Sequence, residues 1–136
     1  GKACDLAGKR LENGRSQEEQ ILIEYFEDGL RDSGYSIKRV GPSENEFRLP
    51  GTISLKFANI EMRKLQTWIA PFVSFSTRSA CSTTKIEVSH VLRAIGLSDI
   101  EANNCARFSV DHASTEKQIE VAVGYFKKYL ENNSNS

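Results

Sequence analysis

One cysteine of this chain lies in surroundings that favour chemical reactivity. Cys81 belongs to a run of small polar residues, 79–85, which offers little apolar surface to bury a thiol. Arg78 precedes it by three residues and Lys85 follows it by four. Positive charge nearby favours the thiolate, the nucleophilic form, over the thiol with its ordinary pKa of about 8.5. The same residues are compatible with an unreactive surface thiol, so the local sequence leaves both interpretations open.

The segments on either side of residues 79–85 must hold Cys81 in place. After it, apolar residues recur at steps of three and four over 86–95, which predicts a helix ending at Gly96. Before it, residues 72–75 predict a brief strand. Other predicted helices cover 1–12, 16–33, 60–69, 98–104 and 114–130, other predicted strands cover 35–40, 52–57 and 106–110, and a polar loop covers 41–50. This order favours an α+β fold, a small and mostly antiparallel sheet covered by helices.

The helix predicted over 16–33 has two features that can be checked. Ser16 and Glu19 have the spacing of a capping box, in which each residue satisfies a backbone amide of the other. The apolar residues at helical spacing, which we expect on its buried face, are Ile21, Leu22, Tyr25, Phe26 and Leu30.

Composition excludes several classes of protein. The 136 residues include 18 basic and 18 acidic side chains, so no net field attracts nucleic acid or an anionic membrane. No apolar run approaches the ~20 residues that span a bilayer, and no secretory signal is present. Three cysteines without Cys-x-x-Cys spacing indicate neither a disulfide framework nor a metal site, and favour a reducing compartment. The chain begins with Gly1 inside a predicted helix, which suggests a fragment of a longer protein.

Four collinear pieces give the chain a family resemblance. They are Ser79-Ala80-Cys81, the run from Ser89 to Leu97, Arg107-Phe108-Ser109-Val110, and Thr115-Glu116 with Ile119. In order and spacing they resemble the C-terminal end of the selenocysteine lyases and cysteine desulfurases, pyridoxal-phosphate enzymes of the class V aminotransferase group. The resemblance covers about 49–130, with a weaker helical match before it.

The resemblance implies a domain and its chemistry. The chain would be the C-terminal small domain of a fold-type I pyridoxal-phosphate enzyme, with helices leading from the large domain over 1–34, a small-domain core over 35–131 and a disordered tail over 132–136. Cys81 would accept selenium or sulfur from selenocysteine or cysteine, leaving alanine, and pass it to an acceptor protein. The parent would be a homodimer in the cytoplasm or in mitochondria.

Arg107 has two interpretations. An arginine inside an apolar strand is typical of a structural ion pair. The resemblance implies instead a guanidinium fork that grips the substrate carboxylate through two hydrogen bonds. Nothing in the sequence resembles the family's cofactor lysine segment or a glycine-rich phosphate loop, so we expect no cofactor-binding residue and no metal ligand in this chain.

Several positions depart from the family pattern. Arg78 and Gly51 stand where relatives usually have glycine and asparagine. Asp111 and His112 replace a usual Gly-Arg after the Arg-Phe-Ser strand, and His90 suits packing better than catalysis.

The choice between the two activities rests on the amino-acid sequences of two segments. The loop over 39–52 favours a selenocysteine lyase, whereas the Cys81 segment favours a cysteine desulfurase. Our first expectation is selenocysteine lyase, with cysteine desulfurase, feeding iron-sulfur cluster or thiolation pathways, as its alternative. A small α+β module that binds a partner without catalysis is the alternative from another class. We expect the chain alone to be inactive.

Overall fold

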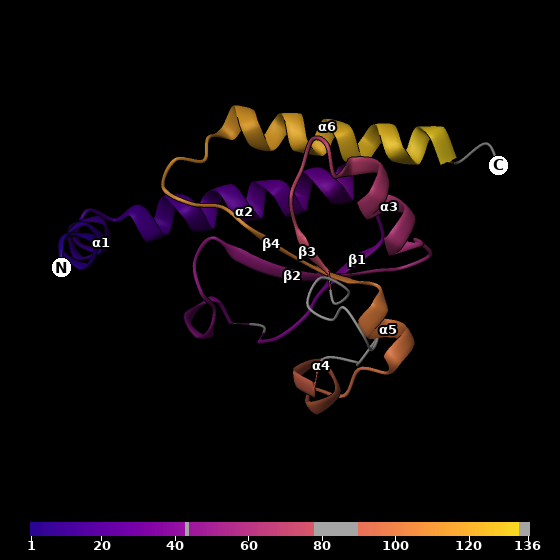
Figure 1. The fold of residues 1–136 in the computed structure, drawn as a ribbon, viewed down its shortest axis with the longest axis horizontal. Helices are drawn as coiled ribbons and strands as arrows, with labels where there is room; N and C mark the ends of the chain where they lie inside the picture. Colours follow the sequence, from indigo (N-terminus) through magenta and orange to yellow (C-terminus); the bar gives the residue numbers. More distant parts are fainter. Residues whose placement is uncertain (43, 78–89, 134–136) are drawn as a thin grey trace.

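The computed structural model describes residues 1–42, 44–77 and 90–133, and Figure 1 shows how they are arranged. The elements in chain order are α1 (Lys2–Glu12), α2 (Arg15–Asp32), β1 (Ile37–Arg39), η1 (Asn45–Phe47), β2 (Thr52–Phe57), α3 (Met62–Ile69), β3 (Ser76–Thr77), α4 (His90–Ala94), α5 (Asp99–Asn103), β4 (Cys105–Ser109) and α6 (Glu116–Asn133).

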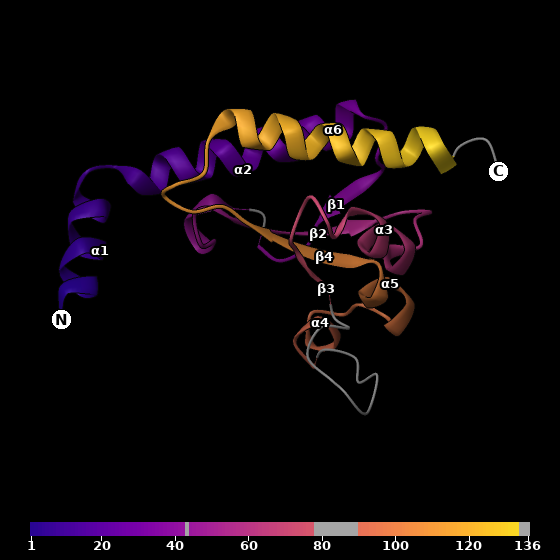
Figure 2. The ribbon, with the colours of Figure 1, turned by 45° about the horizontal axis from the view of Figure 1, so that its top comes forward.

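The strands form one small antiparallel sheet in the order β1-β2-β4-β3. Each of the pairs β1–β2, β2–β4 and β4–β3 is antiparallel. The long helices α2 and α6 lie side by side over one face of this sheet (Figures 1 and 2). The predicted α+β class, with a small antiparallel sheet covered by helices, is therefore confirmed.

The core lies between the sheet and the α2–α6 layer. Strand β2 alternates in burial, with Ile53, Leu55 and Phe57 buried toward the helices. On β4 the corresponding residues are Ala106 and Phe108. The Phe108 ring is the centre of an aromatic cluster, at centroid distances of 4.8 Å from Phe26, 5.0 Å from Phe75, 5.8 Å from Phe126 and 6.2 Å from Phe57.

The opposite face of the sheet carries polar side chains. The alternation of β2 directs Thr52, Ser54 and Lys56 away from the core, and the register places them opposite Ser109, Arg107 and Cys105. The short helices α4 and α5 lie beyond one end of this face (Figures 1 and 2). Among the described residues, no helix covers much of the open face.

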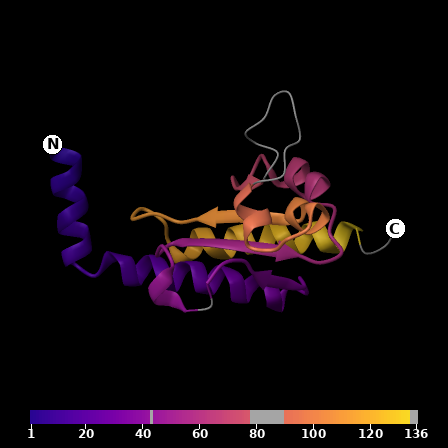
Figure 3. The same cartoon turned by 90° about the horizontal axis from the view of Figure 1, so that it is seen from below.

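Helix α1 extends at a steep angle from the start of α2 and away from the sheet (Figures 2 and 3). The turn between the two helices is at Gly14, which has a φ of 72°. In the described part of the chain, no helix combines the length and the apolar character needed to cross a membrane.

One prediction for α2 was wrong and another was wrong in part. The helix begins at Arg15 and has Gly14 at its N-cap without a side-chain cap bond, so Ser16 lies inside the first turn and cannot cap. Its buried face carries Ile23, Phe26 and Leu30, whereas Ile21 and Tyr25 are 65% and 40% exposed. The charged residue Glu27 interrupts the apolar positions of the true buried face, which hid that face in the sequence.

The predicted strand over 72–75 was also wrong. The amides of Phe72 and Val73 both donate to the carbonyl of Ile69, so this backbone closes a turn after α3. The strand β3 starts only at Ser76. Strand β4 begins one residue earlier than predicted, at Cys105. Of the helix predicted over 86–95, residues 90–94 form α4, and residues 86–89 lie outside the described residues.

Gly51 gives a first test of this fold. It has a φ of 69°, and a Cβ there would lie 3.0 Å from the Cβ of Glu19 and 3.1 Å from the carbonyl oxygen of Val110. Gly14 has a similar φ of 72°, but a Cβ there would meet only the flexible end of Gln17, at 3.4 Å. We expect Gly14→Ala to cost about 1–2 kcal/mol through the left-handed backbone alone. Gly51→Ala should cost roughly 1–3 kcal/mol more, because the added methyl group also crowds its neighbours.

Urea unfolding of the two variants measures both costs. Equal losses of stability would show that the close approach at Gly51 does not exist.

Candidate functional site

Arg107 lies at the centre of the open face of the sheet. It occupies the middle of β4 between the buried residues Ala106 and Phe108, and its own side chain is exposed. Its neighbours across the sheet are Ser54 on β2 and Ser76 on β3. The guanidinium is thus carried by a strand whose alternate residues are fixed in the core, which limits the positions it can adopt.

The side chain of Arg107 makes no ion pair or hydrogen bond with any residue that the structure describes. A structural ion pair would need an acidic partner, and within residues 1–42, 44–77 and 90–133 there is none. An exposed and unpaired guanidinium keeps all five of its N–H donors available to a ligand. This geometry fits anion binding better than it fits the ion-pair alternative.

Cys81, with its neighbours 78–80 and 82–85, lies outside the described residues, but the positions at which that segment leaves and rejoins the fold are described. Strand β3 ends at Thr77, paired with Ala106 of β4. The hydroxyl of Thr77 also donates to Oε1 of Gln66 on α3 at 2.8 Å. The chain returns at His90, which is exposed at the start of α4. The cysteine segment therefore departs from the strand that borders Arg107.

A polar contact joins α5 to the open face. Nζ of Lys56 on β2 lies 2.7 Å from Oε1 of Glu101. Glu101 and Ser98 form the capping box at the start of α5, with the backbone and hydroxyl of Ser98 both donating to Oε2 of Glu101. The hydrogen bond from Lys56, followed by those from Ser98, lowers the pKa of Glu101 to about 2. The predicted cap at Ser98 is confirmed, and it also fixes the carboxylate that neutralises Lys56.

Asp111 and His112 form a turn after β4. Oδ1 of Asp111 accepts a hydrogen bond from the amide of Ala113 at 2.9 Å and another from the hydroxyl of Ser114 at 3.1 Å. These bonds lower the pKa of Asp111 below its ordinary value. His112 is exposed. This departure from the family pattern therefore has a local structural role, since Asp111 closes the turn that leads toward α6.

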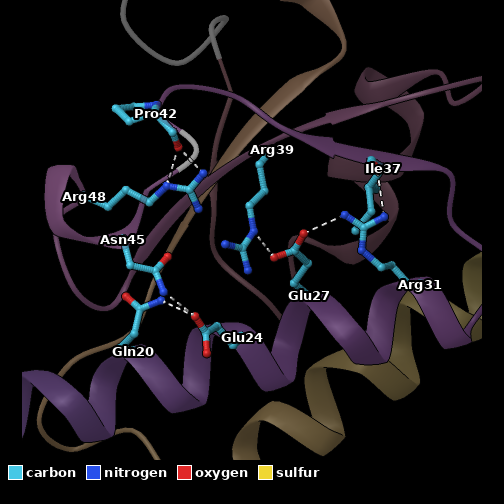
Figure 4. Close-up of polar contacts among 9 residues, drawn as sticks. All are labelled: Gln20, Glu24, Glu27, Arg31, Ile37, Arg39, Pro42, Asn45 and Arg48. Atoms are coloured by element: carbon cyan, nitrogen blue, oxygen red, sulfur yellow. Dashed lines mark hydrogen bonds and ion pairs between the residues drawn. The ribbon is translucent and has the colours of Figure 1, made fainter.

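Sequence reasoning missed an ionic cluster around Glu27 (Figure 4). Glu27 is only 2% exposed, and its carboxylate pairs with Arg31 at 2.7 Å and with Arg39 at the end of β1. Arg31 also donates to the carbonyl of Ile37 at 3.0 Å. The four-residue spacing of Glu27 and Arg31 was the available signal. The cluster attaches the edge strand β1 to α2 and lies on the helix side of the sheet, opposite Arg107.

The described residues do not fit pyridoxal phosphate, which the family resemblance implies. Its imine bond needs a lysine in an enclosed site, and among the lysines described all are exposed except Lys56. Lys56 is half-buried and already paired with Glu101. No group of three His, Cys, Asp or Glu side chains in the described ranges could hold a metal ion.

Comparison with known proteins adds sequence relatives. No family model matches the chain. It is 36% identical over 125 residues to a protein of Anaeromyxobacter sp. strain Fw109-5 described as cysteine desulfurase IscS, covering 90% of this chain and 30% of that protein. A protein of Tolumonas auensis with the same description is 31% identical over 119 residues, covering 87% and 29%. A cysteine desulfurase of Rattus norvegicus is 28% identical over 123 residues, covering 90% and 26%.

Solved structures agree in fold. A NifS-like protein superposes with a TM-score of 0.76 at 24% identity, covering 96% of this chain and 32% of that one. A NifS-like protein from Rickettsia africae gives 0.67 at 23% identity, covering 85% and 29%. The fold is that of part of a NifS-like protein. The chain belongs to the cysteine desulfurase family and spans about 30% of the length of the curated relatives it matches.

The contact between Lys56 and Glu101 predicts a pH dependence. The folded-state pKa of Glu101, about 2, lies below its ordinary value of 4.5. Its contacts therefore contribute to stability above pH 4.5, and that contribution is lost as the pH falls through about 2. NMR titration of the Glu101 carboxyl carbon should show this low pKa. Lys56→Gln should raise the pKa but leave it below 4.5, because the bonds from Ser98 remain.

Lys64→Gln is the matched control, since Lys64 pairs with Glu61 instead. It should leave the titration of Glu101 unchanged. A wild-type Glu101 that titrates near 4.5 would contradict the contact.

Proposed function

We propose that this chain is the small domain of a pyridoxal-phosphate-dependent cysteine desulfurase, in which it binds the amino-acid substrate and accepts its sulfur. The proposal rests on one observation, the 31–36% identity that most of the chain shares with proteins described as cysteine desulfurases. The longer parent would supply a large domain with the lysine that holds the cofactor. The proposed boundaries within this chain are helices leading from the large domain over 1–34, a core over 35–131 and a tail over 132–136.

In this proposal Arg107 binds the carboxylate of the substrate. Its exposure and its lack of a described partner leave the planar fork free for two parallel charge-assisted hydrogen bonds. Because its neighbours Ala106 and Phe108 are fixed in the core, the backbone that carries the fork has a defined position on the sheet. A strand positions a binding group more accurately than a loop does.

Cys81 would accept the sulfur atom. A bond forms between its Sγ and the substrate sulfur while the substrate Cβ–S bond breaks. The electron pair of that bond stays with the carbon skeleton, which takes up a proton and leaves as alanine. The product on the protein is a persulfide, and the thiolate form of Cys81 is the attacking species. Cys81 is five residues beyond Ser76, which is the strand neighbour of Arg107. The covalent chain therefore limits the distance between the Cα atoms of Ser76 and Cys81 to about 18 Å.

Pyridoxal phosphate, when bound by the parent, would supply the electron sink that makes the Cβ–S bond breakable. Since the described residues do not fit the cofactor, the proposal assigns it to the large domain. The purified chain alone should then be inactive. It should also show no absorbance band of a protein-bound imine when it is mixed with pyridoxal phosphate.

The finer question is which chalcogen the parent removes. Relatives described as cysteine desulfurases favour cysteine as the substrate. The amino-acid sequence of the loop over 39–52 is the observation that favours selenocysteine. The two substrates compared in the parent protein, by the alanine that each releases, would separate the two activities. A homodimeric parent, a sulfur or selenium acceptor protein and a cytoplasmic or mitochondrial compartment complete the proposal.

The role of Cys81 can be tested in the parent protein by replacing it. With Cys81→Ser we expect no persulfide on the protein and no alanine from cysteine, because an oxygen nucleophile cannot carry the transferred sulfur. Mass spectrometry of the protein after incubation with cysteine detects the persulfide as one added sulfur atom. The control is Cys105→Ser, since the thiol of Cys105 is buried and bonded to the carbonyl of Glu101. Normal desulfuration by Cys81→Ser would refute the assignment.

The role of Arg107 can be tested by Arg107→Lys, which keeps the charge but removes the fork. We expect the Michaelis constant for the amino acid to rise roughly tenfold to a hundredfold, as loss of a charge-assisted hydrogen bond predicts. The absorbance of the bound cofactor should stay unchanged. A variant that melts early but binds its substrate normally would show that Arg107 is part of the scaffold.

A further inference from the structure

The α4–α5 hairpin, residues 90–103, is attached to the fold with little help from the apolar core. No residue of α4 is buried, and Ala102 is the buried residue of α5. Large apolar side chains of the hairpin face solvent instead, since Val91, Ile95 and Ile100 are 55%, 52% and 77% exposed. Polar contacts must therefore do much to hold the hairpin beyond one end of the sheet (Figures 1 and 2).

Within the hairpin, backbone bonds and one ion pair make the two helices a single unit. Gly96 has a φ of 88°, and its amide donates to the carbonyl of Arg93 at 2.9 Å. The amide of Leu97 donates to the carbonyl of Leu92 at 3.0 Å, which completes a Schellman motif at the end of α4. Nε and Nη2 of Arg93 donate to Oδ1 and Oδ2 of Asp99 at 3.0 Å and 2.9 Å. This bidentate geometry is the strong form of an arginine–carboxylate pair, so it fastens α4 to the first turn of α5.

A second ion pair joins the hairpin to the sheet. Nζ of Lys56 on β2 lies 2.7 Å from Oε1 of Glu101, and the two side chains are partly shielded from solvent, at 27% and 41% exposed. The thiol of Cys105 at the start of β4 also donates to the carbonyl of Glu101 at 3.3 Å. The path from the sheet to α4 therefore runs through two ion pairs in series.

The position of α4 sets the length of chain on which Cys81 is held. Thr77, before the cysteine segment, is fixed by its pairing with β4, and His90, after it, begins α4. With the hairpin attached, 12 residues (78–89) connect these two fixed points, whereas with the hairpin released 27 residues (78–104) connect Thr77 to Cys105. The effective concentration of a tethered group falls roughly as the −3/2 power of the connecting length, so release would dilute the thiol at its site about threefold.

We infer that Arg93, Asp99, Lys56 and Glu101 are positioning residues for sulfur transfer. Their two ion pairs fix α4, and with it the returning end of the chain that carries Cys81, relative to the open face of the sheet. These four residues act through the place of the hairpin and do not touch the substrate. The inference rests on the proposed function, and it goes further by assigning the ion pairs of the hairpin to the same reaction.

The test uses the parent protein and follows a single turnover with cysteine, in which mass spectrometry measures the persulfide on Cys81. Asp99→Lys places like charges opposite each other and should slow persulfide formation at saturating cysteine, up to the limit of about threefold. The half-saturating concentration of cysteine should stay unchanged, because Arg107 and its strand are unaltered. Adding Arg93→Glu restores opposite charges and should return the rate toward that of the wild type.

The second pair has its own variants. Lys56→Glu repels Glu101 but leaves the capping box of α5 intact, and it should slow the reaction as Asp99→Lys does. Adding Glu101→Gln removes the repulsion while glutamine preserves the box, so the rate should recover.

A matched control makes the same change of charge elsewhere. Glu120→Lys alters α6, which lies over the other face of the sheet, and it should transfer sulfur as the wild type does. Circular dichroism and the absorbance of the bound cofactor identify a variant that fails to fold. In that case the isosteric Asp99→Asn replaces Asp99→Lys and should slow the reaction in the same direction.

Failure of the inference and failure of the proposed function give different results. A wild-type parent that forms no persulfide on Cys81 would refute the proposed function, and the inference with it. If the wild type forms the persulfide but Asp99→Lys or Lys56→Glu reacts at the rate of Glu120→Lys, the inference alone is overturned. It is also overturned if the partner changes leave the rate low, or if the half-saturating concentration rises while the saturated rate holds.

Discussion

The alternation of side chains along β4 is the constraint on which the candidate site depends. Burial of Ala106 and Phe108 against the helices leaves Arg107 no direction except the open face. Phe108 contacts aromatic rings from α2, from α6, from β2 and from the segment before β3, so its position is fixed from four directions. A shift of one residue in the pairing of β4 would bury the arginine and expose the phenylalanine, which the core would resist strongly. Packing on one face thus positions a charge on the other.

The two faces of the sheet have different roles, since one holds the core and the other carries the candidate site. On the helix side, the buried carboxylate of Glu27 is paired with Arg31 and Arg39 and attaches β1 to α2. On the open side, Lys56 and Glu101 attach α5, and Asp111 closes the turn after β4. Between these anchors, the side chain of Arg107 is left without a partner among the described residues. The described residues nearest to the cysteine segment are Thr77 at the end of β3, which pairs with β4, and His90 at the start of α4.

Sequence reasoning succeeded where local rules are strong. The alternation of Thr52–Phe57 predicted both bounds of β2, and Ser98 with its helix was predicted by capping chemistry. It failed where a charged or aromatic residue breaks the local rule. Glu27 sits on the buried face of α2 because Arg39, twelve residues away, neutralises it, and no helical period can anticipate that partner. The aromatic run after α3 resembles a strand, yet the hydrogen bonds of Phe72 and Val73 to Ile69 make it a turn. Cys81 and Arg107 were predicted as separate site residues, whereas the cross-strand neighbours of Arg107 could be identified only from the strand register.

An unpaired surface arginine contributes little to the stability of a fold, and this bears on the alternative of a non-catalytic interaction module. Such a module would bind through its exposed helices, and its sheet face could carry any polar residue at position 107. The structure instead has an exposed arginine there, whose side chain has no partner among the described residues. Nothing in the packing of Ala106 and Phe108 requires an arginine at position 107, since a serine or threonine there would suit the strand equally well. A carboxylate that binds at Arg107 would explain the arginine, and the relationship to cysteine desulfurases leads us to propose this role.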